Sequence, residues 1–306
     1  MAKTKALNKR RKSIRSIRKI TRTMELISTA NYRKAMERAL SAVAFSDRLT
    51  RMVRNLASGT GVEVSHPLLV AHEQTKNVSM LVLTSNRGLC GGYNGSVLRL
   101  AWKRWKQLTG DDEAALDQKV ENPSLVISGK RGISYFKFRK ITPVQTYTQF
   151  EDKPSFDEVE AIANQYLEQY LTGKLDRLEI VYTKFVSMSK QVAVHETLLP
   201  LSEIGSSDDK DDAKSDDKQA NVEYEFLPSA SSILDEVVPS SFRTKLFKCF
   251  LDAAVSEQIA RMVAMKAATE NADSMIQILT MAVNRSRQAQ ITGELTELIG
   301  GVEALK

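Results

Sequence analysis

The run from Ser240 to Thr292 constrains the fold of this chain more than any other stretch, because it contains neither glycine nor proline. Pro239 precedes the run and Gly293 follows it, and these two residue types typically mark the start and the end of a helix. At about 1.5 Å per residue, such a helix is roughly 80 Å long, which exceeds the diameter of an ordinary domain. We therefore expect a long helix that either protrudes or is surrounded by other protein.

Apolar and small side chains recur along this run at alternating spacings of three and four residues. One line of heptad positions consists of Val255, Met262, Thr269, Ile276, Val283 and Gln290. The adjoining line consists of Gln258, Met265, Ala272, Leu279 and Ser286. A stripe this narrow needs a second helix to cover it.

The chain begins as it ends, since no glycine or proline occurs from Lys9 to Ala57. The heptad positions of this first run are Ile14, Thr21, Ser28, Ala35, Ala42, Leu49 and Leu56 on one line, and Ile17, Met24, Asn31, Arg38, Phe45 and Met52 on the other. The simplest way to cover both stripes is an antiparallel coiled coil of the two terminal helices. Because the bulky seam residues are few, we expect a larger assembly to hold the pair together.

Between the two runs the hydrophobic pattern indicates an α/β domain. It predicts strands over 78–84, 125–128 and 144–148, helices over 94–108, 132–140 and 156–171, and two alternating, antiparallel strands over 178–186 and 191–199. Strands that alternate with helices favour a mostly parallel, Rossmann-like sheet. The predicted organisation is an N-terminal helix over 1–58, a central α/β domain over 70–230 and a C-terminal helix over 235–306. Within the central part, residues 204–221 form an acidic loop that we expect to be flexible.

Charge and cysteine content narrow the function classes. Ten lysines or arginines and no acid lie between Met1 and Arg22, whereas nine acids and three lysines lie between Glu203 and Glu225. No apolar segment of signal-peptide type follows the basic start, so we expect residue 1 to begin the mature protein. Cys90 and Cys249 are far apart in the sequence and indicate a reducing compartment rather than a disulfide framework. The longest apolar runs are too short to span a bilayer, so any membrane attachment is expected to go through partners.

A glycine-rich stretch from Ser85 to Asn94 follows the first predicted strand, and it has three interpretations. It is a structural turn, a contact loop, or a phosphate cradle of the kind that forms at a helix N-terminus. The spacing required for a Walker loop or a dinucleotide fingerprint is absent. Cys90 has no histidine nearby in the sequence, so we interpret it as a buried side chain rather than a nucleophile. The dispersed cysteines and histidines give no zinc spacing.

Four segments resemble the gamma subunit of F-type rotary ATP synthases, in the same order and over the whole chain. They are Arg15-x-x-Arg18-Lys19-Ile20-Thr21-x-x-Met24, Arg87-Gly88-Leu89-Cys90-Gly91-Gly92-x-Asn94, the run from Ser256 to Ala272 with Ala260-Arg261-Met262 at its centre, and Arg287-Gln288-Ala289-x-Ile291-Thr292-x-Glu294.

The sequence departs from the family at Asn86, where aspartate is common, and at Val302, where alanine is usual. The acidic loop 204–221 lies where photosynthetic members carry a regulatory cysteine pair, but it has no cysteine, and we interpret it as a solvated insertion.

The resemblance implies a central-stalk rotor subunit that couples proton flow through a membrane ring to ATP synthesis or hydrolysis in a hexamer of alpha and beta subunits. It implies as partners the alpha and beta subunits, the epsilon subunit and the c-ring, on the cytoplasmic face of a bacterial cell membrane. The chain itself is expected to be non-catalytic and to bind no cofactor, metal or nucleic acid. Carried over by position, the expected rotor contacts are Met24, Arg87, Cys90, Arg261, Arg287, Gln288, Thr292 and Glu294.

Two other classes compete with this interpretation. A basic coiled-coil protein that binds nucleic acid would show salt-sensitive DNA affinity dependent on the lysines from Lys9 to Lys19. An enzyme that uses the glycine-rich loop would bind nucleotide as an isolated chain. The rotor subunit accounts for both long helices, the absent active-site motifs and the order of the four segments, so we adopt it.

Overall fold

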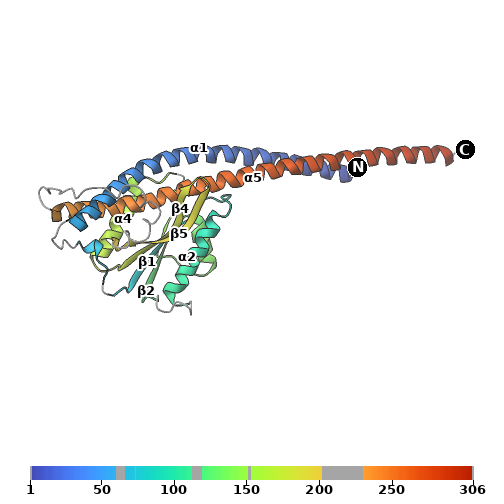
Figure 1. Cartoon of the computed structure of the whole chain (residues 1–306). Coiled ribbons are helices and arrows are strands. Elements are labelled where there is room, and N and C mark those ends of the chain that lie inside the picture. Colours follow the sequence, from blue (N-terminus) through green and yellow to red (C-terminus); the bar gives the residue numbers. More distant parts are fainter. Residues whose placement is uncertain are drawn as a thin grey trace. The chain divides into compact units, whose positions relative to one another are not determined.

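A computed structural model describes residues 2–59, 66–72, 74–111, 119–150, 153–201 and 230–304. The elements follow in the order α1 (Ala2–Gly59), η1 (Pro67–Leu69), β1 (Asn77–Leu83), α2 (Tyr93–Thr109), β2 (Asn122–Ser128), α3 (Lys130–Phe138), β3 (Gln145–Tyr147), α4 (Phe156–Leu171), β4 (Arg177–Ser187), β5 (Lys190–Leu199) and α5 (Ala230–Ala304) (Figure 1). Every helix and strand predicted up to residue 199 is therefore confirmed. The acidic loop 204–221 lies outside the described residues.

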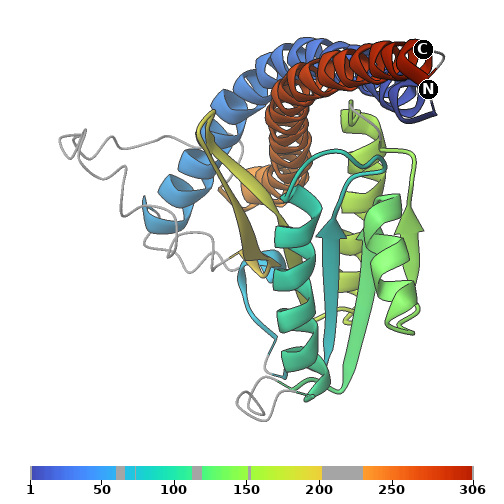
Figure 2. The ribbon, with the colours of Figure 1, turned by 90° about the vertical axis from the view of Figure 1, so that its right-hand side faces the viewer.

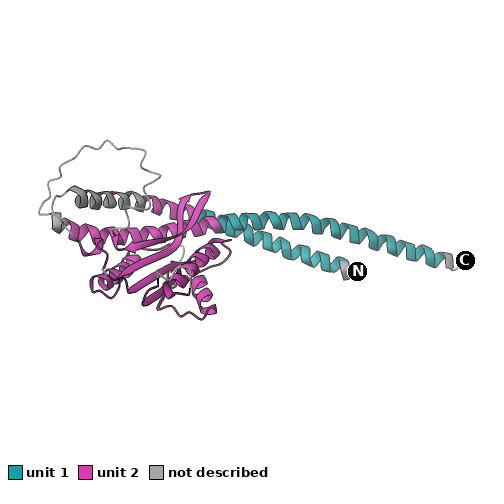
Figure 3. Cartoon of the chain, turned by 60° about the horizontal axis from the view of Figure 1, so that its bottom comes forward, with its two compact units in different colours: residues 1–30, 261–306 teal, residues 31–260 magenta. Residues whose placement is uncertain are grey.

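The chain divides into two compact units (Figure 3). One unit consists of residues 1–30 and 261–306, and the other of residues 31–260. We call the first the helical pair and the second the α/β unit. Each long helix contributes to both units, so the α/β unit contains parts of α1 and α5 as well as the sheet.

A five-stranded sheet in the order β3-β2-β1-β4-β5 forms the centre of the α/β unit. The pairs β1–β2, β1–β4 and β2–β3 are parallel, and only the β4–β5 pair is antiparallel. This arrangement confirms the mostly parallel, Rossmann-like sheet expected from the alternating pattern. Every residue of β1 from Val78 to Leu83 is buried, so protein covers both faces of this central strand.

The side chains of β1 alternate between two cores, one on each face of the sheet. Val78, Met80 and Val82 pack with residues of α2 and α3 on one face. Leu81 and Leu83 pack with residues of α4 and α5 on the other face. Figure 2 shows α2 and α3 side by side on one side of the sheet. The strand period of two residues therefore builds a three-layered unit.

A buried carboxylate connects one helix layer to the sheet. Glu179 on β4 is 1% exposed, and its carboxylate accepts hydrogen bonds from Arg104 Nε at 2.8 Å and Nη2 at 2.6 Å. His195 Nε2 on β5 lies 2.8 Å from the same carboxylate, and Arg177 Nε lies 2.9 Å from it. Burial alone would raise the pKa of Glu179, but the hydrogen bonds and charges of Arg104 and His195 outweigh it and lower the pKa to about 2.

The helical pair is antiparallel. Thr4 Oγ1 lies 2.8 Å from Ser286 Oγ, and Thr21 Oγ1 lies 2.8 Å from Thr269 Oγ1, so residue numbers rise along α1 as they fall along α5. A salt bridge of 2.8 Å joins Arg18 to Asp273 along the same pair. These contacts confirm the predicted antiparallel pairing of the terminal helices.

The predicted seam of α5 is confirmed, whereas that of α1 is wrong at two positions. All eleven heptad positions predicted from Val255 to Gln290 are buried or half-buried. On α1, however, Ile17 is 47% exposed, and Arg38 is exposed while the neighbouring Ala39 is 5% exposed. A nearly straight helix of 3.6 residues per turn drifts by about 20° per heptad, so a strict heptad assignment moves off the buried stripe. The α1 positions from Ala42 onward lie outside the described side chains.

The interpretation of Pro239 and Gly293 as helix boundaries is wrong, because α5 includes both, whereas the predicted helical range 235–306 agrees with α5 to within five residues at each end. Leu234, Val238 and Phe242 around the proline are at most 1% exposed. Burying three such side chains contributes about 5 to 9 kcal/mol, more than the roughly 3 kcal/mol that a helical proline costs. Gly293 costs only about 1 kcal/mol, and good helix formers surround it. Tertiary packing therefore outweighs the start signal at Pro239, and the cost of Gly293 is too small to end the helix there.

Candidate contact sites on the helical pair and the glycine-rich loop

The glycine-rich loop between β1 and α2 is held by a small hydrogen-bond network. Asn94 Oδ1 accepts from the Ser85 backbone N–H at 3.0 Å, and Asn94 Nδ2 donates to Ser85 Oγ at 2.7 Å. The same amide nitrogen donates to Cys90 Sγ at 3.1 Å, and Ser85 Oγ donates to the Arg87 carbonyl at 2.6 Å. The two ends of the loop are thus tied together, which fixes the backbone between them.

Asn86 fastens this loop to two other connections of the α/β unit. Its Nδ2 donates to the carbonyls of Thr148 at 2.9 Å and Phe150 at 2.8 Å, and its Oδ1 accepts from the Lys130 N–H at 3.1 Å. An ionised aspartate has no N–H to donate to those carbonyls. The asparagine at position 86, where the family commonly has aspartate, therefore fits the two carbonyl acceptors around it. The sequence alone did not reveal this role.

The loop directs two side chains outward and one inward. Leu89 has a left-handed backbone with φ of 64° and is 60% exposed, and Arg87 is exposed beside it. Cys90 is 2% exposed, so its thiol supports the loop from within, as expected for a buried cysteine. Of the two loop residues predicted as contacts, only Arg87 has its side chain at the surface. Leu89, which the prediction did not include, is the more prominent apolar side chain.

The predicted contacts on the helical pair differ in exposure. Arg287, Gln288, Thr292 and Glu294 are all exposed along the last turns of α5, and Met24 on α1 is half-buried. Arg261, by contrast, is only 6% exposed. Glu294 accepts a 2.8 Å hydrogen bond from Gln290, which leaves its second oxygen available. The helix end thus presents a row of hydrogen-bonding side chains without a surrounding core.

Large apolar side chains accompany this polar row. From Arg287 to Val302 every residue except Gln290 is exposed. Ile291 is 49% exposed, Leu295 54%, and Leu298, Ile299 and Val302 are 61 to 68% exposed. Five large apolar residues within four turns exceed what a solvated helix end needs. The pattern indicates a surface that another protein covers.

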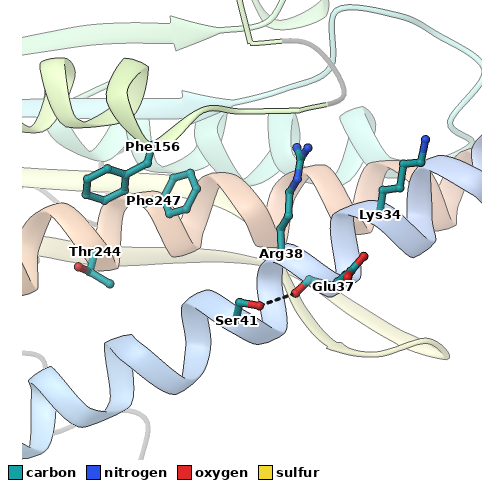
Figure 4. Close-up of a pocket in the computed structure, with 7 residues that line it drawn as sticks. All are labelled: Lys34, Glu37, Arg38, Ser41, Phe156, Thr244 and Phe247. Atoms are coloured by element: carbon teal, nitrogen blue, oxygen red, sulfur yellow. Dashed lines mark hydrogen bonds between the residues drawn. The ribbon is translucent and has the colours of Figure 1, made fainter.

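A groove of about 740 Å³ lies in the α/β unit between α1, α4 and α5 (Figure 4). Phe156 and Phe247 form part of its wall, with ring centroids 5.3 Å apart in an edge-to-face arrangement. The other lining residues are Lys34, Glu37, Arg38, Ser41 and Thr244. The groove is open and lacks a convergent set of polar groups aimed at one point. It therefore does not resemble a catalytic pocket.

The described part of the chain contains no group of three or more histidine, cysteine or acidic side chains arranged to hold a metal ion. Among the same residues, no helix has both the length and the hydropathy to cross a bilayer. What the described residues do contain is an α/β unit and an antiparallel pair of long terminal helices, with exposed side chains on a loop of the first and at a helix end of the second. This combination defines a class of shaft-like subunit.

Comparison with known proteins identifies the family. Residues 3–305 match the ATP synthase family. The chain is 58% identical to the ATP synthase gamma chain of Rhodopirellula baltica over 306 residues, covering all of both chains. It is 34% identical to that of Chlorobaculum tepidum over 306 residues, again with full coverage of both. The chain belongs to the family of ATP synthase gamma chains, so the prediction of a non-catalytic central-stalk rotor subunit is confirmed.

Solved structures agree with the fold. A chain of the Euglena gracilis mitochondrial ATP synthase rotor gives a TM-score of 0.58 at 17% identity, covering 95% of this chain and 99% of that one. A chain of the same organism's OSCP/F1/c-ring structure gives a TM-score of 0.62 at 19% identity, covering 99% and 95%. At these identities the likeness extends to the architecture alone.

Proposed function

We propose that this gamma chain is the shaft that transmits rotation between a membrane ring and a nucleotide-binding hexamer of alpha and beta subunits. The observation that carries the proposal is the exposed end of α5, where five large apolar side chains alternate with hydrogen-bonding ones. Leaving these apolar groups in water forgoes about 1.5 to 3 kcal/mol each relative to burial. An encircling hexamer would bury them while the polar neighbours keep each contact reversible.

The remaining partners follow from the same family assignment. A related structure from Tetrahymena thermophila is described as a central stalk with its c-ring, and the Euglena structures include a rotor and an F1/c-ring assembly. By analogy we assign to this chain an epsilon subunit and a c-ring as further partners. The complex would place the chain on the cytoplasmic face of a bacterial membrane, attached through the ring.

The predicted contact residues take two roles in this proposal. Arg287, Gln288, Thr292 and Glu294 form the polar row at the helix end, where hydrogen bonds to the hexamer form and break at each step. Arg87, together with Leu89, forms a second contact from the loop. Cys90 is buried and supports the loop from within. Arg261 is buried 26 residues before Arg287 on α5, and Met24 is half-buried on α1, so neither belongs to the row at the helix end.

Reconstitution with the alpha, beta and remaining subunits of the same synthase tests the proposal. Replacing Arg287, Gln288 and Thr292 together by alanine removes hydrogen bonds worth about 1 kcal/mol each. We expect the complex to assemble but to drive several-fold less proton pumping per ATP hydrolysed. The matched control is Lys190→Ala at the exposed start of β5, which we expect to leave pumping unchanged. Failure of the wild-type chain to assemble with the hexamer would refute the proposal.

A further inference from the structure

The outer surface of α2 and α3 carries a concentration of positive charge. Seven exposed side chains make up this surface, which we call the cationic face, and they are Arg99, Lys103, Lys130, Arg131, Lys137, Arg139 and Lys140. Neither helix contains an acidic residue, and within the described part of the chain none of the seven pairs with a carboxylate. The nearest acids in the sequence lie between the two helices, from Asp111 to Asp117 and at Glu121.

Exposed apolar side chains border the cationic face where α3 ends. Phe138 is 88% exposed and Val144 is 76% exposed, the two highest values among the large apolar side chains of the described residues. Phe138 is the last residue of α3, and Lys140 follows with a left-handed backbone at φ of 61°. Lysine and arginine thus flank an outward-pointing aromatic ring on both sides.

The aromatic rings of Trp102 and Tyr135, close to the end of α3, already have a cation over them. The Arg139 guanidinium lies 4.1 Å from the centroid of the Trp102 ring and 4.8 Å from that of Tyr135. Cation–π contacts at these distances hold the guanidinium in place. Because Arg139 covers these two rings, bases of a single-stranded nucleic acid could not stack on that side of them. The arrangement instead favours an anionic surface that takes both charge and one inserted apolar group.

We propose that the cationic face binds the anionic phospholipid headgroups of the membrane beside which the rotor turns. The inference rests on the proposed function, because attachment to a membrane ring is what brings this domain to a lipid surface. Lysine and arginine near an anionic bilayer each contribute about 1 kcal/mol, and an aromatic ring enters the headgroup region. The occupants are therefore acidic lipids, with Phe138 as the inserted group.

Vesicle flotation of the complex assembled from this chain and the alpha and beta subunits tests the proposal. We expect binding to vesicles of phosphatidylcholine with phosphatidylglycerol, little binding to phosphatidylcholine alone, and weakening as salt rises. Lys137→Gln with Lys140→Gln should lower the affinity at least tenfold, and Phe138→Ser about tenfold. The matched control, Lys153→Gln with Lys190→Gln, removes two exposed lysines elsewhere in the α/β unit and should change the affinity less than twofold.

Three results would overturn the proposal. Equal binding to neutral and acidic vesicles would exclude headgroup recognition. Unchanged affinity of the Lys137, Lys140 and Phe138 variants would place lipid binding elsewhere, for example on the basic N-terminal arm. Normal vesicle binding combined with lost capture of the epsilon subunit or the c-ring would identify the cationic face as a protein contact. The rate of ATP hydrolysis by complexes that contain these variants tests the proposed function independently of lipid binding. We expect this rate to equal that of the wild-type complex.

Discussion

The α/β unit and the helical pair are built on opposite principles. In the α/β unit, both faces of the sheet are covered by cores of fully buried leucine, isoleucine, valine and aromatic residues. In the helical pair, the buried apolar side chains among the described residues are Met265, Ala272 and Val283, and hydroxyl groups occupy the other buried seam positions. The α/β unit therefore specifies its own structure, whereas the helical pair depends more on what surrounds it.

The weakly apolar seam of the helical pair suits a part that rotates inside its partners. A seam of small and hydroxylated residues brings two helices close together with little hydrophobic stabilisation. The apolar groups that an isolated coiled coil would bury lie instead on the outside, as at Ile278 and Met281, which are 61% and 65% exposed. A partner can then stabilise the pair from outside. Substitutions at three single sites and at one residue pair test this comparison, from the largest expected effect to the smallest.

The largest effect is expected in the α/β unit, from Glu179→Gln. The substitution leaves the half-buried Arg104 and Arg177 without the counter-charge of the buried Glu179, and breaking a buried ion pair in this way costs about 3 to 5 kcal/mol. Denaturant unfolding should report this loss. The control is Glu168→Gln, an exposed residue of α4, which should change stability by less than about 0.5 kcal/mol.

The pH dependence of the same residue provides a second check. Because the pKa of Glu179 is lowered to about 2 in the folded state, its stabilisation is complete above the unfolded pKa near 4.5. It is lost as the pH falls from about 4.5 to about 2. The Gln variant should lack this part of the acid destabilisation, and an identical acid profile for both proteins would contradict the assignment.

Asp252→Asn is expected to act in the opposite direction. Asp252 on α5 is 4% exposed, and burial raises its pKa to about 7, with Lys248 and Lys184 opposing and Glu196 adding to the rise. The folded state therefore favours the protonated acid, so its contribution is present below about pH 4 and lost as the pH rises to about 7. Asparagine should stabilise the protein by about 2 to 4 kcal/mol at pH 8 and by little at pH 4. Equal melting shifts at both pH values would refute this.

Within the helical pair, Ser28→Ala should be stabilising. Ser28 is 1% exposed, and its hydroxyl has no hydrogen-bond partner among the described residues. Removing an unsatisfied buried hydroxyl gains about 1 kcal/mol. Amide hydrogen exchange of residues 20–30 should slow by about fivefold. Thr23→Ala, at an exposed position of the same helix, is the matched control, and faster exchange in the Ser28 variant would argue against the polar seam.

The smallest effect is expected for the Arg18–Asp273 pair. Its atoms are 2.8 Å apart, but the two side chains are 44% and 48% exposed. Solvent screening limits such a pair to well under 1 kcal/mol. A double-mutant cycle with alanine at both positions should give a coupling of about 0.3 kcal/mol that vanishes at high salt. A coupling above 1.5 kcal/mol would show that the helical pair is held by charge rather than from outside.

The elements with a strong local pattern could be predicted from the sequence. The strand from Asn77 is a short, almost continuous apolar run, and the helix from Phe156 buries a side chain every three or four residues. The ends of α5 could not, because the outcome at Pro239 depends on a core assembled from distant segments.

The site was predictable in position but not in detail. The pattern predicted contacts on the loop and on the helix end, which stay predictions, and it predicted the buried Cys90, which is confirmed. It could not tell that the neighbouring Leu89 faces outward. That difference depends on the positive φ of Leu89 and on the amide of Asn94, which are features of three-dimensional geometry. The charged cluster at Glu179 also joins residues from α2, β4 and β5, so no spacing within one segment of the sequence could predict it.

Direct observation of rotation tests the central claim, that this chain is a shaft turning inside its partners. A bead attached through a Lys190→Cys substitution, at the exposed start of β5, would report the motion of the α/β unit in an immobilised complex with alpha and beta subunits. We predict continuous rotation in one direction when ATP is added, and frequent stalling after the helix-end residues Arg287, Gln288 and Thr292 are replaced by alanine. A bead that remains stationary while the complex hydrolyses ATP would contradict the account.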